Sequence, residues 1–70
     1  MTVVDILSHL SWKPDEIQYC YKGEWNKILY PHYTRDFMDD FGGSRVKDDW
    51  LIDCRTNTLY IEIVGEDDSY

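Results

Sequence analysis

The sequence predicts a single small α+β domain with the element order α-β-β-α-β-β, in which two helices pack on one face of a four-stranded, largely antiparallel sheet. Its 70 residues suffice for one domain only. Apolar residues make up 43% of the chain and aromatic residues 16%, which is enough to build a core. These residues follow helical spacing in two segments and form strand-like runs in four others. We expect residues 1–65 to form the domain and residues 66–70 to form an acidic tail.

The first helix is predicted near the amino terminus. Thr2, followed three residues later by Asp5, resembles a capping box in which Asp replaces Glu. Apolar side chains then recur at helical spacing, at Val3, Ile6, Leu7 and Leu10. Pro14 is expected to end the helix, because it cannot donate a backbone hydrogen bond and disfavours helical geometry in the residue before it.

Two strand-like runs, 16–22 and 25–30, predict a first hairpin around Gly23. A two-residue turn, Lys22-Gly23, would place Ile17, Tyr19 and Tyr21 on the face of Ile28. A three-residue turn would instead place them with Trp25 and Leu29. We favour the longer turn, because it groups more apolar surface on one side.

A second helix is predicted from His32 to Phe41, ending at Gly42-Gly43. Its apolar side chains fall at i, i+4, i+5 and i+8, and are Tyr33, Phe37, Met38 and Phe41. Asp36, Asp39 and Asp40 lie on its other side. Like charges at this spacing weaken a helix, so the cluster serves either solubility or a partner.

The last third of the chain predicts a second hairpin. A turn centred on Thr56-Asn57 would pair three sets of apolar residues across the two strands, namely Cys54 with Leu59, Ile52 with Ile61, and Trp50 with Ile63. One face would then be wholly apolar and the other mixed, as in an antiparallel sheet that is solvated on one side.

No group of residues predicts catalysis, and we expect no enzymatic activity, no metal and no cofactor. Cys20, Cys54, His9 and His32 are all more than ten residues apart, whereas structural zinc ligands come in closely spaced pairs. A Cys20–His32 nucleophile pair lacks a glycine loop that could form an oxyanion site. We expect both cysteines to be buried, reduced thiols. The alternatives are one cross-strand disulfide bridge between them or a reactive thiol.

The expected location is the cytoplasm of a bacterial host. No run approaches the roughly 20 apolar residues of a membrane span, and the first five residues lack the basic start of a signal peptide. Two cysteines are also too few for the disulfide framework that small secreted domains usually carry.

Three segments carry a resemblance, namely residues 1–7 with Leu10, the turn Tyr21-Lys22-Gly23-Glu24, and residues 58–63. They resemble small acidic proteins carried by phages and mobile elements of Firmicutes. This group overlaps in setting with host-defence inhibitors such as anti-CRISPR proteins, so the resemblance implies a role of that kind. It assigns no functional residue, and the aromatic middle, Tyr30 to Phe41, departs from the pattern.

The charge balance suggests a partner. Fourteen acidic residues oppose seven basic ones, and the net charge of -7 repels nucleic acid and anionic membranes but attracts basic protein surfaces. We therefore expect an inhibitor, such as an anti-CRISPR protein, that binds the basic surface of a nuclease or CRISPR effector through a row of carboxylates that mimics nucleic acid. The acidic candidates are Asp36, Asp39, Asp40, Asp48 and Asp49, extended by Glu66, Asp67 and Asp68; the aromatic anchors are Trp25, Tyr30 and Tyr33, with Trp12 as a further candidate.

Two alternatives remain open at this stage. The first is a non-catalytic interaction module, self-associating or binding another protein, whose acidity serves only solubility. The second is a small enzyme or metal protein. The aromatic candidates also have a simpler interpretation, because each fits ordinary core or sheet packing. The oligomeric state does not follow from the sequence.

Overall fold

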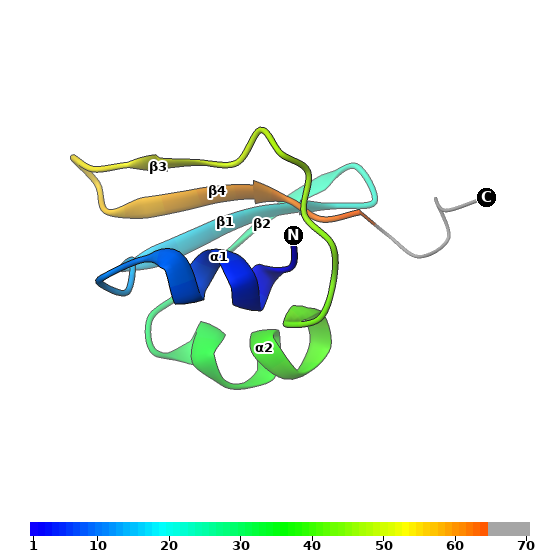
Figure 1. Ribbon diagram of the computed structural model, residues 1–70, viewed down its shortest axis with the longest axis horizontal. Coiled ribbons are helices and arrows are strands. Elements are labelled where there is room, and N and C mark those ends of the chain that lie inside the picture. Colours follow the sequence, from blue (N-terminus) through cyan, green and yellow to red (C-terminus); the bar gives the residue numbers. More distant parts are fainter. Residues whose placement is uncertain (65–70) are drawn as a thin grey trace.

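The computed structural model describes residues 1–64 and has the predicted α+β order (Figure 1). Its elements are α1 (Val3–His9), β1 (Glu16–Tyr21), β2 (Glu24–Leu29), a short 3-10 helix η1 (His32–Thr34), α2 (Asp36–Phe41), β3 (Leu51–Asp53) and β4 (Thr58–Glu62). The predicted acidic tail, residues 66–70, lies outside the described residues.

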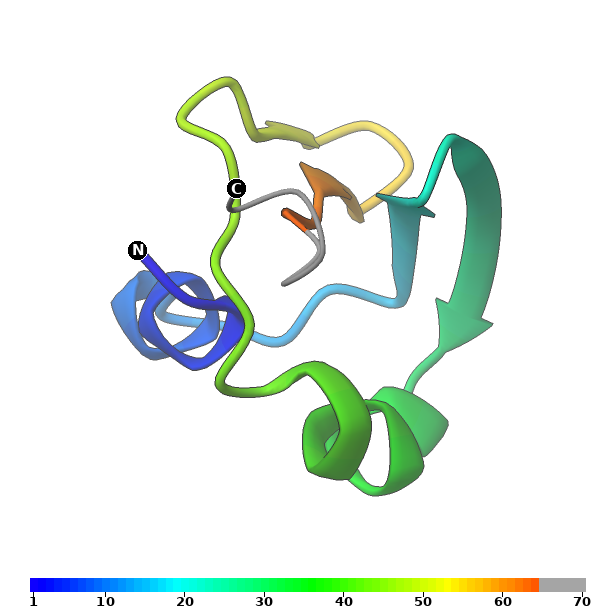
Figure 2. The ribbon, with the colours of Figure 1, turned by 90° about the vertical axis from the view of Figure 1, so that its right-hand side faces the viewer.

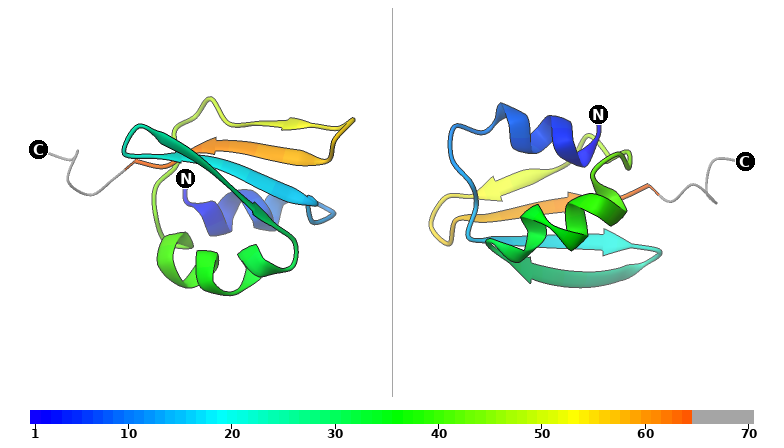
Figure 3. Two further views of the ribbon diagram at one scale, coloured as in Figure 1. Left: turned by 180° about the vertical axis from the view of Figure 1, so that it is seen from behind. Right: turned by 90° about the horizontal axis from the view of Figure 1, so that it is seen from below.

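The four strands form one sheet in the order β2-β1-β4-β3. The central strands β1 and β4 run parallel, and each pairs with an antiparallel edge strand, so the sheet is mixed. Both helices lie on the same face of the sheet, as predicted (Figure 3). Figure 2 shows the strands arranged in an arc with the helices on its inner side. The outer side of the arc therefore has no helix over it.

The amino terminus of α1 is held by its own cap and by the loop after α2. The predicted capping box is present: Asp5 N donates to Thr2 Oγ1 at 3.2 Å, and Thr2 N donates to the Asp5 carboxylate at 2.9 Å. Hydrogen bonding of the Asp5 carboxylate to the Thr2 backbone N–H, and then to the Thr2 side chain, lowers the pKa of Asp5. The next two backbone N–H groups donate outside the helix, from Val3 to Ser44 O and from Val4 to Gly42 O. The helix ends at His9, well before Pro14.

The second helical segment is divided. Where the sequence predicts one helix from His32 to Phe41, the structure has η1 and α2 on either side of Arg35, whose backbone is not helical.

The aromatic side chains of this segment pack on β1. The ring of Phe37 lies 4.8 Å from that of Tyr19, and the ring of Phe41 lies 5.0 Å from that of Tyr21.

The preferred register of the first hairpin is wrong, and the alternative with a two-residue turn is found. Tyr21 pairs with Glu24 and Ile17 pairs with Ile28. Lys22 and Gly23 both have left-handed backbones, with φ of 53° and 81°. A two-residue turn of this kind matches the twist of the strands that it joins, which is why it prevails over apolar grouping. Trp25 and Leu29 are consequently on the face opposite to Ile17.

The register of the second hairpin is also wrong, by two residues. Ile52 pairs with Leu59 and Asp53 with Thr58, so the turn has four residues, 54–57, and Asn57 within it has φ of 52°. A slip by an even number of residues leaves each side chain on its predicted face. The apolar face of this hairpin is therefore the one that the sequence predicts.

The core lies between the helices and the inner face of the sheet. Its buried apolar residues are Val3, Ile6, Ile17, Tyr33, Phe37, Val46, Leu59, Ile61 and Ile63. Tyr33 is fully buried, and its hydroxyl donates a hydrogen bond to Pro14 O at 2.5 Å. Among the described residues, every buried side-chain nitrogen and oxygen atom has a hydrogen-bond partner.

Candidate functional site

The sheet has one covered and one uncovered face, and the strand registers assign each side chain to one of them. The covered face carries the core residues of the strands, beginning with Ile17. We call the other side the uncovered face. Its side chains are Glu16, Gln18, Cys20, Trp25, Lys27, Leu29, Leu51, Asp53, Thr58, Tyr60 and Glu62.

Three large apolar side chains on the uncovered face are more than half exposed: Trp25 (58%), Leu29 (52%) and Leu51 (54%). They lie on the two edge strands, Trp25 and Leu29 on β2 and Leu51 on β3. Aromatic residues that become buried on binding supply much of the free energy of protein interfaces. An exposed Trp beside an exposed Leu on one strand is therefore a candidate contact surface. The uncovered face is thus the part of the sheet with apolar surface available to a partner.

Within residues 1–64, no strand pairs with the outer edge of β2. In an antiparallel pair closed by a two-residue turn, the closing residues exchange hydrogen bonds and every second residue thereafter does the same. The even-numbered residues of β2 therefore face β1, and Tyr30 N, which donates to Asp15 O at 2.9 Å, continues this series. Trp25, Lys27 and Leu29 accordingly direct their backbone N–H and C=O groups to the open edge.

Charges on the uncovered face are arranged unevenly. Lys47 Nζ lies 2.8 Å from the Glu62 carboxylate, and this hydrogen bond and the attraction of the charge raise the pKa of Lys47. Gln18 Nε2 donates to the Glu16 carboxylate at 2.7 Å. Lys27 lies opposite Gln18 and forms no ion pair or side-chain hydrogen bond with another described residue. Between Trp25 and Leu29, the open edge thus carries a cation that is unpaired among residues 1–64.

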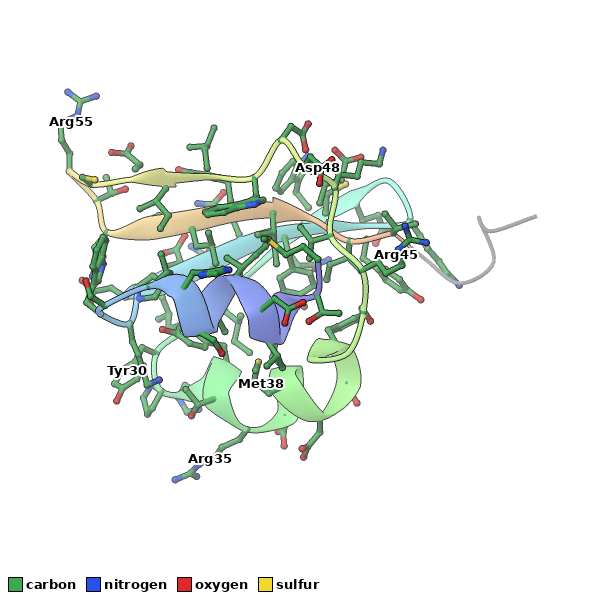
Figure 4. The ribbon with its side chains drawn as sticks, in the orientation of Figure 1. Tyr30, Arg35, Met38, Arg45, Asp48 and Arg55 are labelled. Atoms are coloured by element: carbon green, nitrogen blue, oxygen red, sulfur yellow. The ribbon has the colours of Figure 1, made fainter. Side chains whose placement is uncertain are left out.

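The five acidic candidates lie in two groups. Asp36, Asp39 and Asp40 are exposed on α2, whereas Asp48 and Asp49 are exposed in the loop between α2 and β3. Figures 1 and 2 show this loop leaving the end of α2 and crossing to the opposite side of the molecule, and Figure 4 shows Asp48 on the side remote from α2. A single row through all five carboxylates is not formed. The proposed extension by Glu66, Asp67 and Asp68 lies outside the described residues.

The aromatic candidates have different surroundings. Tyr33 is 0% exposed, so its assignment as a partner-binding anchor is wrong: it is a core residue. Tyr30 is half-exposed and packs edge-to-face on the Tyr33 ring, 5.7 Å away. Trp12 is also half-exposed, and its indole N–H donates to Asn57 Oδ1 at 2.7 Å. Of the aromatic candidates, Trp25 alone belongs to the uncovered face.

Neither cysteine belongs to a cluster of metal ligands among residues 1–64. Both are free, but only Cys20 is buried; Cys54 is exposed in the turn after β3, contrary to the expectation that both are buried. Within residues 1–64, no cluster of three or more His, Cys, Asp or Glu side chains is placed to hold a metal ion.

A groove of about 330 Å³ lies between the two helices. Val4 and Leu7 of α1 and Met38 of α2 line it, with Lys13 at its rim, and Figure 4 shows Met38 directed toward α1. A second hollow of about 320 Å³ lies beside Cys20, Lys47 and Glu62, next to the last described residue, Val64.

The chain matches no protein-family model, no curated protein and no solved structure. The resemblance to small acidic phage proteins therefore stays a prediction. In the part of the chain that the structure describes, no helix is long and apolar enough to cross a membrane.

Sequence reasoning missed Lys27, Leu29 and Leu51 as site residues. The signal was present in the first hairpin. The two-residue Lys22-Gly23 turn places Trp25, Lys27 and Leu29 on one face, opposite to Ile17.

Proposed function

We propose that the chain is a non-catalytic protein-binding module whose binding surface is the β2 side of the uncovered face. The observation that supports this proposal most strongly is the exposure of Trp25 and Leu29 beside an edge strand with unpaired backbone groups. Natural edge strands are usually short, bulged, covered or charged, because an open edge promotes pairing with other chains. β2 carries such a charge, Lys27, but it is six residues long and exposes Trp25 and Leu29 on either side of that charge, which supports a surface kept for binding.

A nucleic-acid-mimicking inhibitor is the second candidate, and the net charge of -7 favours it. A basic partner is attracted by that field whichever face it contacts. Mimicry through a row of carboxylates is less well supported, because α2 and the loop with Asp48 lie on opposite sides. An inhibitor role remains compatible with the first candidate, since the uncovered face and the charge act together when the partner is basic.

Site-specific photo-crosslinking separates these two functions. Benzoylphenylalanine, whose photoreactive side chain keeps a large aromatic ring, is placed at position 25, 39 or 48 in separate preparations, and each is incubated in bacterial lysate at low and high salt. We expect position 25 to crosslink one specific protein at both salt concentrations, because apolar contacts are not screened by ions. An excess of unmodified wild-type protein should compete for this product, and the Trp25→Ala variant should not.

The opposite pattern would contradict the proposal. Crosslinks from positions 39 and 48 that disappear at high salt, with none from position 25, would assign binding to the acidic groups. A matched control at Trp12, which is half-exposed outside the uncovered face, shows whether an exposed aromatic position is reactive by itself.

A further inference from the structure

We infer that β2 accepts an extended segment of the partner as an additional strand of the sheet, and that Lys27 selects a segment with an acidic side chain at its centre between two apolar ones. This inference rests on the proposed function and specifies how the binding surface works.

The backbone of β2 provides the first support. Trp25, Lys27 and Leu29 direct their N–H and C=O groups outward, as the register with β1 and the Tyr30–Asp15 hydrogen bond require. These three residues are spaced to exchange hydrogen bonds with alternate residues of an added strand. The other edge strand, β3, has only three residues and offers a shorter ladder.

The side chains of the same three residues provide the second support. They lie on the uncovered face in the order Trp25, Lys27, Leu29, so an added strand places alternate side chains beside an apolar, a cationic and another apolar group. Lys27 has no partner among the described residues, and Glu16, an acid on the same face, is bonded to Gln18. An incoming carboxylate would therefore meet an uncommitted ammonium group.

The same arrangement disfavours a second copy of this chain. If two β2 strands pair antiparallel in the register centred on Lys27, which pairs all three outward residues, Trp25 lies opposite Leu29 of the copy and Lys27 lies opposite its own copy at the two-fold axis. Like charges directly opposite each other destabilise a strand pair. A lysine in the middle of an edge strand is a known protection against such pairing. Lys27 thus destabilises pairing with a second copy of β2 and favours an acidic segment.

Two synthetic peptides test the inference. The first is acetyl-Thr-Val-Thr-Glu-Thr-Val-Thr-amide, and the second has Lys in place of Glu. Each is titrated into the ¹⁵N-labelled protein, and amide shifts are recorded for wild type, Lys27→Glu and the control Lys13→Glu, which makes the same charge change in the exposed segment before β1.

We expect the wild type to bind the Glu peptide about three- to tenfold more tightly than the Lys peptide, with shifts concentrated in β2. Lys27→Glu should reverse this preference, whereas Lys13→Glu should retain it. In addition, Lys27→Thr should show a concentration-dependent dimer in sedimentation, because the like-charge contact is removed, while the wild type stays monomeric.

Other results would overturn the inference. Equal binding of both peptides, the same preference in Lys27→Glu, shifts confined to the groove between α1 and α2, or no shifts at all would each do so. A wild-type dimer through β2 would replace the acidic segment by a second copy. The crosslink from position 25 is independent of these peptides, so strand addition can fail while the proposed binding surface stands.

Discussion

The hydroxyl of Tyr33 donates a hydrogen bond of 2.5 Å to the carbonyl oxygen of Pro14, which joins η1 to the segment just before β1. Both residues are buried. Tyr33→Phe would leave the Pro14 carbonyl without this partner, and we expect it to lower the free energy of unfolding by about 1–3 kcal/mol. Urea denaturation measures the change. Tyr60→Phe, on the uncovered face, is the matched control and should change stability much less.

The same hydroxyl gives a pH dependence. Burial raises the pKa of Tyr33 to about 12 from 10.0, with smaller contributions from Tyr30 and Asp15. The folded protein therefore keeps the phenol protonated where the unfolded chain ionises it. The resulting stabilisation is complete below about pH 10 and is lost as the pH rises toward 12. Tyr33→Phe should flatten this part of the stability profile, and an unchanged slope would contradict the assignment.

Gly42 is the residue after the end of α2, and its carbonyl oxygen accepts a hydrogen bond from Val4 N of α1. A Cβ atom at this position would lie 2.4 Å from Met38 O and 3.2 Å from Val4 Cγ2, whereas a Cβ atom at Gly43 would have no atom within 4 Å. We expect Gly42→Ala to destabilise the fold by about 1–3 kcal/mol and Gly43→Ala to be nearly neutral. Thermal unfolding of the two variants checks this. Equal melting temperatures would mean that Gly42 does not pack against Met38 O and Val4 as described.

The turn at Gly23 tests the register of the first hairpin, on which the candidate site depends. Gly23 has φ of 81° and an open environment, so Gly23→Ala adds backbone strain without a steric clash. We expect a loss of about 1–2 kcal/mol in the free energy of unfolding. A three-residue turn in solution would remove the need for this conformation at Gly23, and a neutral effect would therefore support that register.

Much of the fold follows from local signals in the sequence. The capping box of Thr2 and Asp5 marks the start of α1, and alternation assigns Ile52, Leu59 and Ile61 to the covered face even with the second register displaced by two residues. The break at Arg35 and the parallel pairing of β1 with β4 are not local. They depend on how aromatic side chains such as Phe37 pack on the sheet.

The candidate site does not follow from the register that the apolar pattern favours. Choosing the register that groups the most apolar surface presumes that every apolar side chain belongs to the core, yet Trp25 and Leu29 point away from it. Departures from such local rules occur preferentially at functional positions. The acidic clusters are readable in the sequence, but their separation on opposite sides depends on the path of the chain between α2 and β3.

Trp25 should be dispensable for stability if its role is binding. It is 58% exposed, so we expect Trp25→Ala to change the free energy of unfolding by less than about 1 kcal/mol. Ile17→Ala, which empties a fully buried position on the neighbouring strand, should cost about 2–5 kcal/mol. Denaturant titration of both variants makes the comparison. A large loss in Trp25→Ala would identify Trp25 as a structural residue.

The central claim is that the outward backbone groups of β2 are free to bind a partner strand. Amide hydrogen exchange along β2 tests it most directly, because exchange rates report which N–H groups are hydrogen-bonded before and after a peptide is added. In the free protein, the amides of Asn26 and Ile28 should be protected by β1, and those of Trp25, Lys27 and Leu29 should exchange rapidly. Adding the Glu-containing peptide should slow exchange at these three alternate residues. Slow exchange there in the free protein would contradict the open edge of β2, and rates that the peptide leaves unchanged would contradict the addition of a strand to it.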